Sequence, residues 1–263
     1  MTGNQYLSQI LYKYQVRNLS LYTNQISNLK TILKGWANSC FIETLESGSR
    51  AKWTAIHLAS DVDYLVSLKS NCNESSWWLK SIYDSLYVKL KEVYWNSNVR
   101  KQNVSFRIII GGDLEVDVTP ARKHSGNTNY HWLYVSKKDT WQQTNIQIHK
   151  TDISQSWRTN EIKLLKIWRE LNNLDFPSIY AEYLIIDNIL HGKTTNIDYL
   201  ADNFLYILRE LSKDSGNPLF ARIVDPANSN NTLSDLLTIN EKNLIINKAK
   251  ESSLKPYWEN IIW

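Results

Sequence analysis

The hydrophobic pattern changes once along the chain, near residue 155, and this change limits the folds that the chain can adopt. Before that point, segments typical of strands are interspersed with segments of helical spacing. After it, only helical spacing recurs. This order predicts an α+β protein, in which a mixed sheet with flanking helices precedes a helical domain. We therefore expect two domains, residues 1–155 and residues 156–263, with the boundary between Lys150 and Arg158.

The spacing of apolar residues also predicts the individual elements. Helices are expected over residues 7–14, 29–36, 75–95, 160–171, 177–190, 196–211 and 240–252. Strands are expected over residues 41–46, 60–68, 104–110, 114–118, 131–136 and 141–149. A tight turn at Gly111-Gly112-Asp113 should join two of these strands.

Composition excludes several classes of protein. Hydrophobic residues make up 43% of the 263 residues, which excludes a mostly disordered chain, and the net charge of +4 is compatible with an anionic ligand without requiring one. The sequence has no apolar run of the ~18–20 residues that a spanning helix needs, and no signal-peptide pattern at its start. Two cysteines, Cys40 and Cys72, cannot make a disulfide framework. We expect a cytoplasmic protein with reduced thiols.

A pair of carboxylates marks the candidate functional site. Asp61 and Asp63 lie two residues apart in a predicted strand. Alternate residues of a strand share a face, so these side chains project together, roughly 6–7 Å apart at ~3.3 Å per residue. Neighbouring carboxylates repel each other unless a cation or a proton lies between them. By spacing alone, a solvated strand face is the commoner explanation, but the pair also suits Mg²⁺ bound together with substrate phosphates.

A second strand offers a third carboxylate. Glu115 and Asp117 share one face of the predicted strand, while Val116 and Val118 share the other. Three carboxylates can hold two metal ions ~3.5–4 Å apart, of which one activates a hydroxyl nucleophile and the other neutralises a triphosphate. Asp117 is the favoured third ligand, and Glu115 remains an alternative.

Upstream, Gly48 and Ser49 form a candidate phosphate-binding turn. Glycine permits close approach of the backbone to a phosphate, and serine can donate a hydrogen bond. Backbone N–H groups at a turn that opens a helix attract anions. Arg50 and Lys52 add positive charge beside this turn.

Five motifs in order resemble those of the polymerase-β-like nucleotidyltransferase superfamily. The segment GSRAKWT…SDVDYLV resembles its G-S…D-x-D signature, and LEVDVTPAR resembles its third-carboxylate strand. In the second half, EIKLLKIWRE resembles a helix that carries a triphosphate-binding lysine, and PSIYAEYL resembles the segment beside the bound nucleotide. IVDPANSNNTL is similar to a motif of oligoadenylate synthases and bacterial cyclic-oligonucleotide synthases, the group that the chain resembles most.

The resemblance implies roles for individual residues. Asp61, Asp63 and Asp117 would be the metal ligands and catalytic residues, with Asp117 helping to deprotonate the attacking hydroxyl. The nucleotide-binding residues would be Gly48, Ser49, Arg50, Lys52, Lys166, Ser178 and Tyr180, the last by stacking on the base. Residues 1–155 would hold an N-terminal helix and the catalytic core, and residues 156–263 would form a helical domain that clamps the nucleotide. Trp53 and Ile179 depart from the family pattern, at positions that usually hold glycine and tyrosine.

The resemblance also implies an activity. We expect a nucleotidyltransferase with two Mg²⁺ ions, for which Mn²⁺ can substitute, that polymerises nucleoside triphosphates such as ATP or dATP into a cyclic or linear messenger of anti-phage defence. A separate effector protein would sense the product, and a nucleic acid is a conceivable activator. One alternative is transfer of a single nucleotide to a protein, a tRNA end or a small molecule. Another is a catalytically silent nucleotide-binding regulator.

Several other residues have simpler expected roles. Trp77, Trp78 and Trp168 fall in helical stripes and should be buried, whereas His124 and His131 should lie on the surface or in loops. Asp225 can start a turn, and the terminal segment WENIIW can dock on the rest of the chain or contact a partner. The basic residues Arg122, Lys123, His124, Lys137 and Lys138 are either a solvated surface or a site that steers polyanions.

Overall fold

The chain divides into two compact units that do not follow the predicted boundary. The computed structural model describes residues 1–59, 61–72, 78–95 and 98–263. A sheet unit comprises residues 18–51 and 61–149, and a helical unit comprises residues 1–17, 52–60 and 150–263. We expected two continuous segments that meet near residue 155. Instead, the N-terminal segment and a short central segment belong to the helical unit, because their apolar residues Leu7, Ile10 and Ile56 are part of its core.

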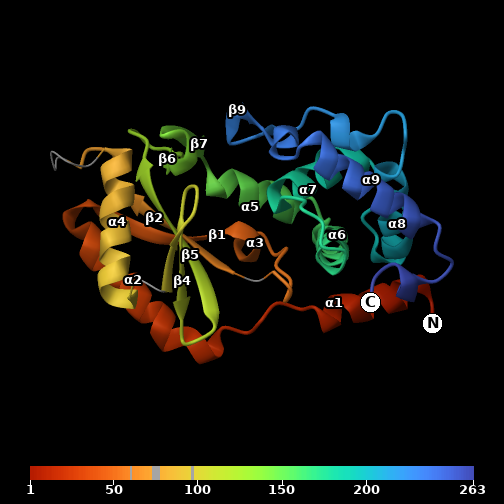
Figure 1. Ribbon diagram of the computed structural model, residues 1–263, viewed down its shortest axis with the longest axis horizontal. Coiled ribbons are helices and arrows are strands. Elements are labelled where there is room, and N and C mark those ends of the chain that lie inside the picture. The colour runs from red at the N-terminus through yellow and green to blue at the C-terminus, as the bar shows by residue number, and fades with distance from the viewer. Residues whose placement is uncertain (60, 73–77, 96–97) are drawn as a thin grey trace. The chain divides into compact units, whose positions relative to one another are not determined.

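The sheet unit is built on a mixed sheet, which has seven strands within the described residues (Figure 1). The strands are β1 (Phe41–Ser47), β2 (Val62–Leu68), β3 (Val99–Lys101), β4 (Phe106–Ile110), β5 (Leu114–Lys123), β6 (His131–Val135) and β7 (Thr140–Thr144). The order is β1-β2-β5-β4-β3, with β6 joined to the end of β5 and β7 joined to β6. Among the strand pairs of the described residues, that of β2 with β5 is parallel and the others are antiparallel.

The two faces of this sheet have different chemistry. On one face, Val62, Tyr64 and Val66 of β2 and Val116 and Val118 of β5 are buried. Helices α2 (Thr23–Ala37) and α4 (Leu79–Tyr94) contribute buried residues to the same hydrophobic cluster, and Figure 1 shows both helices along one side of the sheet. Because side chains alternate along a strand, the residues between the valines point to the opposite face, and these include the predicted carboxylates.

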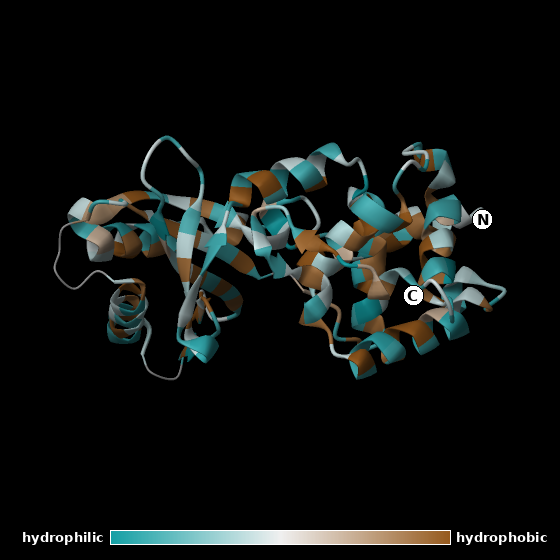
Figure 2. Ribbon diagram, turned by 90° about the horizontal axis from the view of Figure 1, so that it is seen from above, coloured by the Kyte–Doolittle hydropathy of each residue, from teal (hydrophilic) through white to brown (hydrophobic). Residues whose placement is uncertain are grey.

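The helical unit is built around a large hydrophobic core. Its helices are α1 (Gly3–Lys13), α6 (Thr159–Leu171), α7 (Ser178–Leu184), α8 (Leu200–Leu211) and α9 (Ile239–Ser253), and α5 (Ile146–Gln155) leads into it from the sheet unit. A short hairpin of β8 (Val224–Asp225) and β9 (Asn228–Thr232) precedes α9. Bands of hydrophobic and hydrophilic residues along the helices in Figure 2 reflect the spacing that predicted them. Among the described residues, no helix is long and apolar enough to cross a membrane.

Most predicted elements are present, and the main error lies at the boundary between the two halves. The predicted strand over 141–149 ends at Thr144, and a helix begins at Ile146. The Oδ1 atom of Asn145 accepts hydrogen bonds from the backbone N–H groups of Gln147 and Ile148, at 3.1 and 3.3 Å, and so caps this helix. The predicted first residue of β2, Ser60, and the predicted helix segment 75–77, with Trp77, lie outside the described residues.

Some expectations for single residues were confirmed. Trp168 is fully buried. Asp225 does start a turn, since its Oδ1 atom accepts from the N–H of Ala227 at 2.9 Å. The last residues dock on the helical unit, where the hydroxyls of Tyr6 and Tyr14 donate to the last two backbone carbonyls.

Three expectations were wrong. Trp78 is 76% exposed, because it precedes α4 and is not part of the helical stripe. His131 is buried on β6. The expected reduced thiols of Cys40 and Cys72 are joined in a disulfide, with Cα atoms 5.5 Å apart. The two cysteines flank the antiparallel pair β1–β2, in which the N–H of Lys69 donates to the carbonyl of Cys40, and no spacing rule reveals that proximity.

The buried His131 should make the protein sensitive to acid. Burial lowers the pKa of this histidine from 6.5 to about 4, while its Nε2 atom lies 2.8 Å from the Ser67 hydroxyl. The unfolded chain therefore binds a proton between pH 6.5 and pH 4 that the folded chain does not bind. The free energy of unfolding should fall through this window, by up to roughly 3 kcal/mol.

Denaturant unfolding at several pH values checks this expectation. His131→Gln should lose less stability than the wild type between pH 7 and pH 4.5, whereas a variant of the exposed His191, His191→Gln, should follow the wild type. Equal pH dependence of His131→Gln and the wild type would contradict the assignment.

Candidate functional site

The parallel pairing of β2 with β5 brings the predicted carboxylates together. Asp63 and Asp117 are direct register partners, so their side chains lie next to each other on the face opposite α2 and α4. Asp61 immediately precedes β2. Asp117 is 8% exposed, whereas Asp61 and Asp63 are partly exposed. The sheet therefore places all three predicted aspartates in one part of the sheet unit.

Arg107 on β4 is the cationic centre of this cluster. Its Nε atom donates to Oδ1 of Asp117 and its Nη2 atom donates to Oδ2 of the same carboxylate, both at 2.9 Å. The Nη2 atom also donates to Asp61, and the Nη1 atom donates to Glu115 at 2.7 Å. A planar guanidinium with five N–H donors is suited to such a shared, partly bidentate contact.

The charges of the cluster shift the pKa values of its members. Burial raises the pKa of Asp61, and the negative charges of Asp117 and Glu115 act in the same direction, while Arg107 acts against them. The hydrogen bonds to Asp117 raise the pKa of Arg107, so the guanidinium keeps its charge. The cluster thus holds several carboxylates around one permanent cation.

The donor set fits a divalent metal, although the side chains are not gathered around a metal position. Within the described residues, no three histidine, cysteine, aspartate or glutamate side chains come close enough together to hold an ion. However, Asp61 and Asp117 both accept hydrogen bonds from the same Nη2 atom of Arg107. A single cationic atom can therefore bridge these two carboxylates, and carboxylate oxygens are the ligands that Mg²⁺ prefers.

The glycine-serine turn lies against the same carboxylates. Gly48 has φ +62° and begins a one-turn helix, α3 (Gly48–Ala51), directly after β1. A Cβ atom on Gly48 would lie 1.8 Å from Oδ2 of Asp63. Ser49 and Arg50 follow in this turn. The absence of a side chain at Gly48 therefore lets Asp63 pack directly against the backbone of the predicted phosphate-binding turn.

The two predicted nucleotide-binding lysines, Lys52 and Lys166, meet in the helical unit. Lys52 and Lys166 are both buried, and both contact the fully buried carboxylate of Glu182. Lys52 donates to Oε2 of Glu182, the Lys166 Nζ atom lies 3.8 Å from Oε1, and Thr54 donates to Oε1 at 2.7 Å. Although burial alone would raise it, Lys52 and Lys166 hold the pKa of Glu182 below its usual value. One carboxylate thus balances two buried ammonium groups.

Ser178 and Tyr180, the other two predicted residues of this half, both lie on α7. The Ser178 hydroxyl accepts a hydrogen bond from Nη2 of Arg169 at 3.0 Å. Tyr180 is fully buried, and its hydroxyl donates to the carbonyl of Leu219 at 2.9 Å. The Tyr180 ring packs in the core of the unit and presents no open face for a base to stack on.

Sequence reasoning missed the two residues that organise these clusters, Arg107 and Glu182. Arg107 alternates with the buried Phe106 and Ile108 of β4, a pattern that marks it as a residue of the opposite face. Glu182 stands within a run of buried residues on α7, where an unpaired carboxylate would be costly. The sequence shows both patterns, but it does not show which residues Arg107 and Glu182 contact. Lys52 and Glu182, for example, are 130 positions apart.

The close contact of Gly48 with Asp63 predicts that Gly48→Ala lowers the stability more than the same substitution at a glycine without close neighbours. The new Cβ atom would collide with Asp63, in addition to the backbone cost of about 1–2 kcal/mol for a left-handed alanine. Gly126→Ala is the matched control, since Gly126 has φ +87° in the same unit and no atom within 4 Å of its Cβ position. In denaturant unfolding, Gly48→Ala should lose at least about 1 kcal/mol more than Gly126→Ala. Equal losses would contradict this packing.

The ion cluster of Lys52, Lys166 and Glu182 predicts that Glu182→Gln strongly lowers the stability of the fold. The neutral amide would remove the carboxylate charge that faces the buried ammonium groups of Lys52 and Lys166, which should cost about 3–5 kcal/mol. The control is Glu251→Gln, which breaks solvent-exposed pairs with Lys248 and Lys255 and should change the stability far less. Thermal and denaturant unfolding of both variants measure the difference, and similar stabilities would show that Glu182 does not hold the lysines.

Comparison with known proteins identifies the family. The family model described as "Second Messenger Oligonucleotide or Dinucleotide Synthetase domain" matches residues 1–156, whereas no curated protein matches the chain. Several solved structures share the fold. The structure of CdnC from E. coli MS115-1 with ATP is 20% identical, with a TM-score of 0.70 over 95% of this chain and 90% of that chain.

Two further structures extend this likeness. The CD-NTase CdnG of Bradyrhizobium diazoefficiens, in complex with GTP, is 10% identical, with a TM-score of 0.72 over 96% of this chain and 91% of that chain. The c-UMP-AMP synthase CdnE of Rhodothermus marinus is 15% identical, with a TM-score of 0.55 over 93% and 94% of the two chains. The predicted α+β fold, with a polymerase-β-like core and a helical part, is thereby confirmed. Because the family model covers more than half of its length, the chain belongs to the Second Messenger Oligonucleotide or Dinucleotide Synthetase family, and it is a nucleotidyltransferase.

Proposed function

We propose that this nucleotidyltransferase joins nucleoside triphosphates into a cyclic or linear oligonucleotide messenger and releases pyrophosphate. The observation that carries the proposal is the register of β2 with β5, which makes Asp63 and Asp117 direct partners, with Asp61 two residues before Asp63. Two of these carboxylates already share one cationic partner atom. A cluster of this kind suits the charge changes of phosphoryl transfer better than it suits simple binding.

In the proposed reaction, a hydroxyl of one nucleotide attacks the α-phosphorus of another. A phosphorus–oxygen bond to the attacking oxygen forms, the bond to the pyrophosphate oxygen breaks, and Asp117 takes the hydroxyl proton on a carboxylate oxygen. Both oxygens of Asp117 accept hydrogen bonds from Arg107. Each carboxylate oxygen has two lone pairs, so Asp117 can take the proton on Oδ2 while that oxygen also accepts from Arg107.

Asp61, Asp63 and Asp117 are the proposed ligands of two Mg²⁺ ions, for which Mn²⁺ can substitute. When bound, the metal would neutralise the triphosphate and lower the pKa of the attacking hydroxyl. Arg107 would then lose part of its role as the counter-charge of Asp61 and Asp117. Arg107 thus already bridges two of the three proposed ligands, Asp61 and Asp117.

The proposed phosphate-binding residues are those of the turn after β1 and those of the helical unit. Gly48, Ser49 and Arg50 offer backbone N–H groups, a hydroxyl and a guanidinium, respectively. Lys52, Lys166 and Ser178 are the candidates in the helical unit. Because both lysines contact Glu182, they would have to exchange a carboxylate partner for a phosphate.

We further propose that the product serves anti-phage defence in the cytoplasm, where a separate effector protein senses it. The family description supports a messenger as product, and a messenger requires a receptor. ATP or dATP is the favoured substrate. ATP and GTP are the nucleotides named for the related CdnC and CdnG structures.

A product assay tests the proposal. Purified protein is incubated with each labelled nucleoside triphosphate and deoxynucleoside triphosphate, with Mg²⁺ or Mn²⁺, and mass spectrometry examines the small molecules and the protein. Asp61→Ala and Asp63→Ala should each lower turnover by at least about 100-fold, since each removes a charge that stabilises the transition state. Normal turnover in both variants would overturn the proposal.

The same assay separates the remaining alternatives. Loss of activity in Asp117→Asn but not in Glu115→Gln would identify Asp117 as the third carboxylate, and the reverse result would identify Glu115. Label found only on a protein, a tRNA end or an added small molecule would show transfer of a single nucleotide. Nucleotide binding without pyrophosphate release, even after addition of phage-infected lysate, would indicate a catalytically silent regulator.

A further inference from the structure

Arg107 contacts the carboxylates of the candidate site through different nitrogens of its guanidinium. Its Nε and Nη2 atoms donate to Asp117, and Nη2 also donates to Asp61. The third nitrogen, Nη1, donates to Glu115 at 2.7 Å. Because the guanidinium is planar and rigid, these contacts form two separable sets, one on the aspartates and one on Glu115. Arg107 therefore has a partner outside the proposed set of metal ligands.

The register of the sheet explains how Glu115 can keep Arg107. Arg107 on β4 is the register partner of Asp117 on β5, and Ile109, two residues further along β4, is the partner of Glu115. Glu115 is therefore the diagonal neighbour of Arg107 on the same face, a position that long side chains reach. The Glu115 side chain is 43% exposed, compared with 12% for that of Asp117. A guanidinium that left the aspartates but stayed with Glu115 would move towards solvent.

Charge makes Arg107 and a divalent ion competitors for the aspartates. A carboxylate oxygen has two lone pairs, but two cations on the same carboxylates repel each other. Since Nη2 contacts both Asp61 and Asp117, an ion that binds these two carboxylates meets the guanidinium charge at close range. Binding of the ion therefore favours departure of the guanidinium.

Asp117 has a second hydrogen-bond donor, which carries no charge. The Nε2 atom of Gln102 donates to Oδ1 of Asp117 at 3.2 Å, from the turn that joins β3 and β4. The Ser105 hydroxyl donates to Oε1 of the same amide at 2.7 Å and so fixes the orientation of the amide. Because a neutral amide does not repel a metal ion, Gln102 can hold Asp117 in place after Arg107 has left.

We propose that Arg107 is an exchangeable counter-cation: when a divalent ion binds, its guanidinium releases Asp61 and Asp117 and stays on Glu115. Glu115 is then a positioning residue for Arg107 and not a metal ligand. The exchange controls how tightly the aspartates bind metal, and it keeps the arginine within the site. This inference rests on the proposed metal site.

Direct binding of the metal by Glu115 is the competing explanation. The negative charge of Glu115 raises the pKa of Asp61, so these two carboxylates lie near each other. The two explanations differ in one respect. If Glu115 acts through Arg107, its effect on metal affinity depends on the presence of Arg107, whereas a ligand would act without it.

The test measures binding of Mn²⁺ alone, without nucleotide, by electron paramagnetic resonance of the unbound ion. Arg107→Gln should bind Mn²⁺ about 10-fold more tightly than the wild type, because the ion no longer displaces charge-assisted hydrogen bonds. Arg107→Lys, which keeps the charge but not the planar fork, should lie between the two. The matched control is Arg100→Gln, which removes the exposed register partner of Arg107 on β3 and should leave the affinity within about 2-fold.

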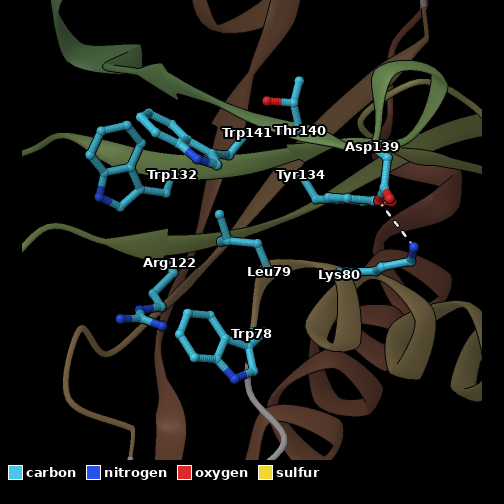
Figure 3. A pocket seen from close by; sticks show the side chains of 9 residues that line it. All are labelled: Trp78, Leu79, Lys80, Arg122, Trp132, Tyr134, Asp139, Thr140 and Trp141. Carbon is cyan, nitrogen blue, oxygen red and sulfur yellow. Dashed lines mark hydrogen bonds and ion pairs between the residues drawn. The ribbon is translucent and has the colours of Figure 1, made fainter.

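A second control is the arginine of the strand that carries Asp117. Arg122 lies five residues after Asp117 on β5 and therefore on the opposite face of the sheet. Figure 3 shows it lining a pocket together with Trp78 and Trp132. Arg122→Gln should also leave Mn²⁺ binding within about 2-fold. A gain in either control as large as that of Arg107→Gln would overturn the proposal, since loss of any positive charge from the unit would then explain the result.

A double-mutant cycle tests the role of Glu115. Glu115→Gln should weaken Mn²⁺ binding, because Arg107 loses the partner with which it stays when the ion binds. The same substitution in the Arg107→Gln background should cause a loss that is at least about 3-fold smaller. An equal loss in both backgrounds would overturn the proposal and favour Glu115 as a metal ligand.

NMR spectroscopy follows the exchange in the wild type itself. The Nε–H group of Arg107 donates to Oδ1 of Asp117 at 2.9 Å, and its signal is assigned by its absence in Arg107→Lys. Mg²⁺ should shift this signal and speed up the exchange of its proton with water, with the same midpoint as Mg²⁺ binding. An unchanged Nε–H signal at saturating Mg²⁺ would overturn the proposal, whether or not Arg107→Gln folds.

Asp61→Ala separates the exchange from the metal site on which it rests. This variant should weaken Mn²⁺ binding at least about 10-fold. Binding as tight as that of the wild type would overturn both the metal site and the exchange. Weaker binding in Asp61→Ala without tighter binding in Arg107→Gln would overturn the exchange alone. Unfolding curves of each variant show whether the fold is intact.

Discussion

The parallel pairing of β2 with β5 is the contact on which the sheet unit depends. Its register sets Asp63 beside Asp117, and it simultaneously sets Val62 beside Val116 and Tyr64 beside Val118 on the opposite face. The same hydrogen bonds therefore bury the apolar face under α2 and α4 and gather the carboxylates on the other face. One face of these strands serves stability and the other carries the candidate site, so a change of register would disturb both at once.

The two units solve a similar electrostatic problem with opposite signs. In the sheet unit, one arginine, Arg107, compensates several carboxylates. In the helical unit, one carboxylate, Glu182, compensates Lys52 and Lys166. Charged groups that are removed from water need partners of opposite charge, and in each unit these partners are residues of that same unit. A bound polyanion would replace Glu182 as the partner of the lysines, and a bound cation would replace Arg107 as the partner of the aspartates. The strength of these internal ion pairs therefore helps to set the affinity for both ligands.

Much of this organisation could be predicted from the sequence, because it depends on local periodicity. Strand alternation predicted that Asp61 and Asp63 share a face, the resemblance to nucleotidyltransferase motifs singled out these two and Asp117 as site residues, and helical spacing predicted the helices of both halves. What could not be predicted depends on contacts between distant segments, such as the pairing of Lys52 with Glu182 or of Arg107 with Asp61. The helix after Asn145 was missed for another reason, since a single capping side chain there outweighs the strand-like pattern of the preceding residues.

Strand β5 also constrains how the sequence can evolve. It carries Asp117 on one face and, five residues later, Arg122 on the other. Insertion or deletion of one residue between them would turn Arg122 towards the face that carries Asp117. The residues that follow would also change faces, so that apolar side chains become exposed and polar ones become buried. Length variation among relatives should therefore be absent from this strand and accumulate in the connection that follows it, residues 124–130, while the strand itself changes only by substitution.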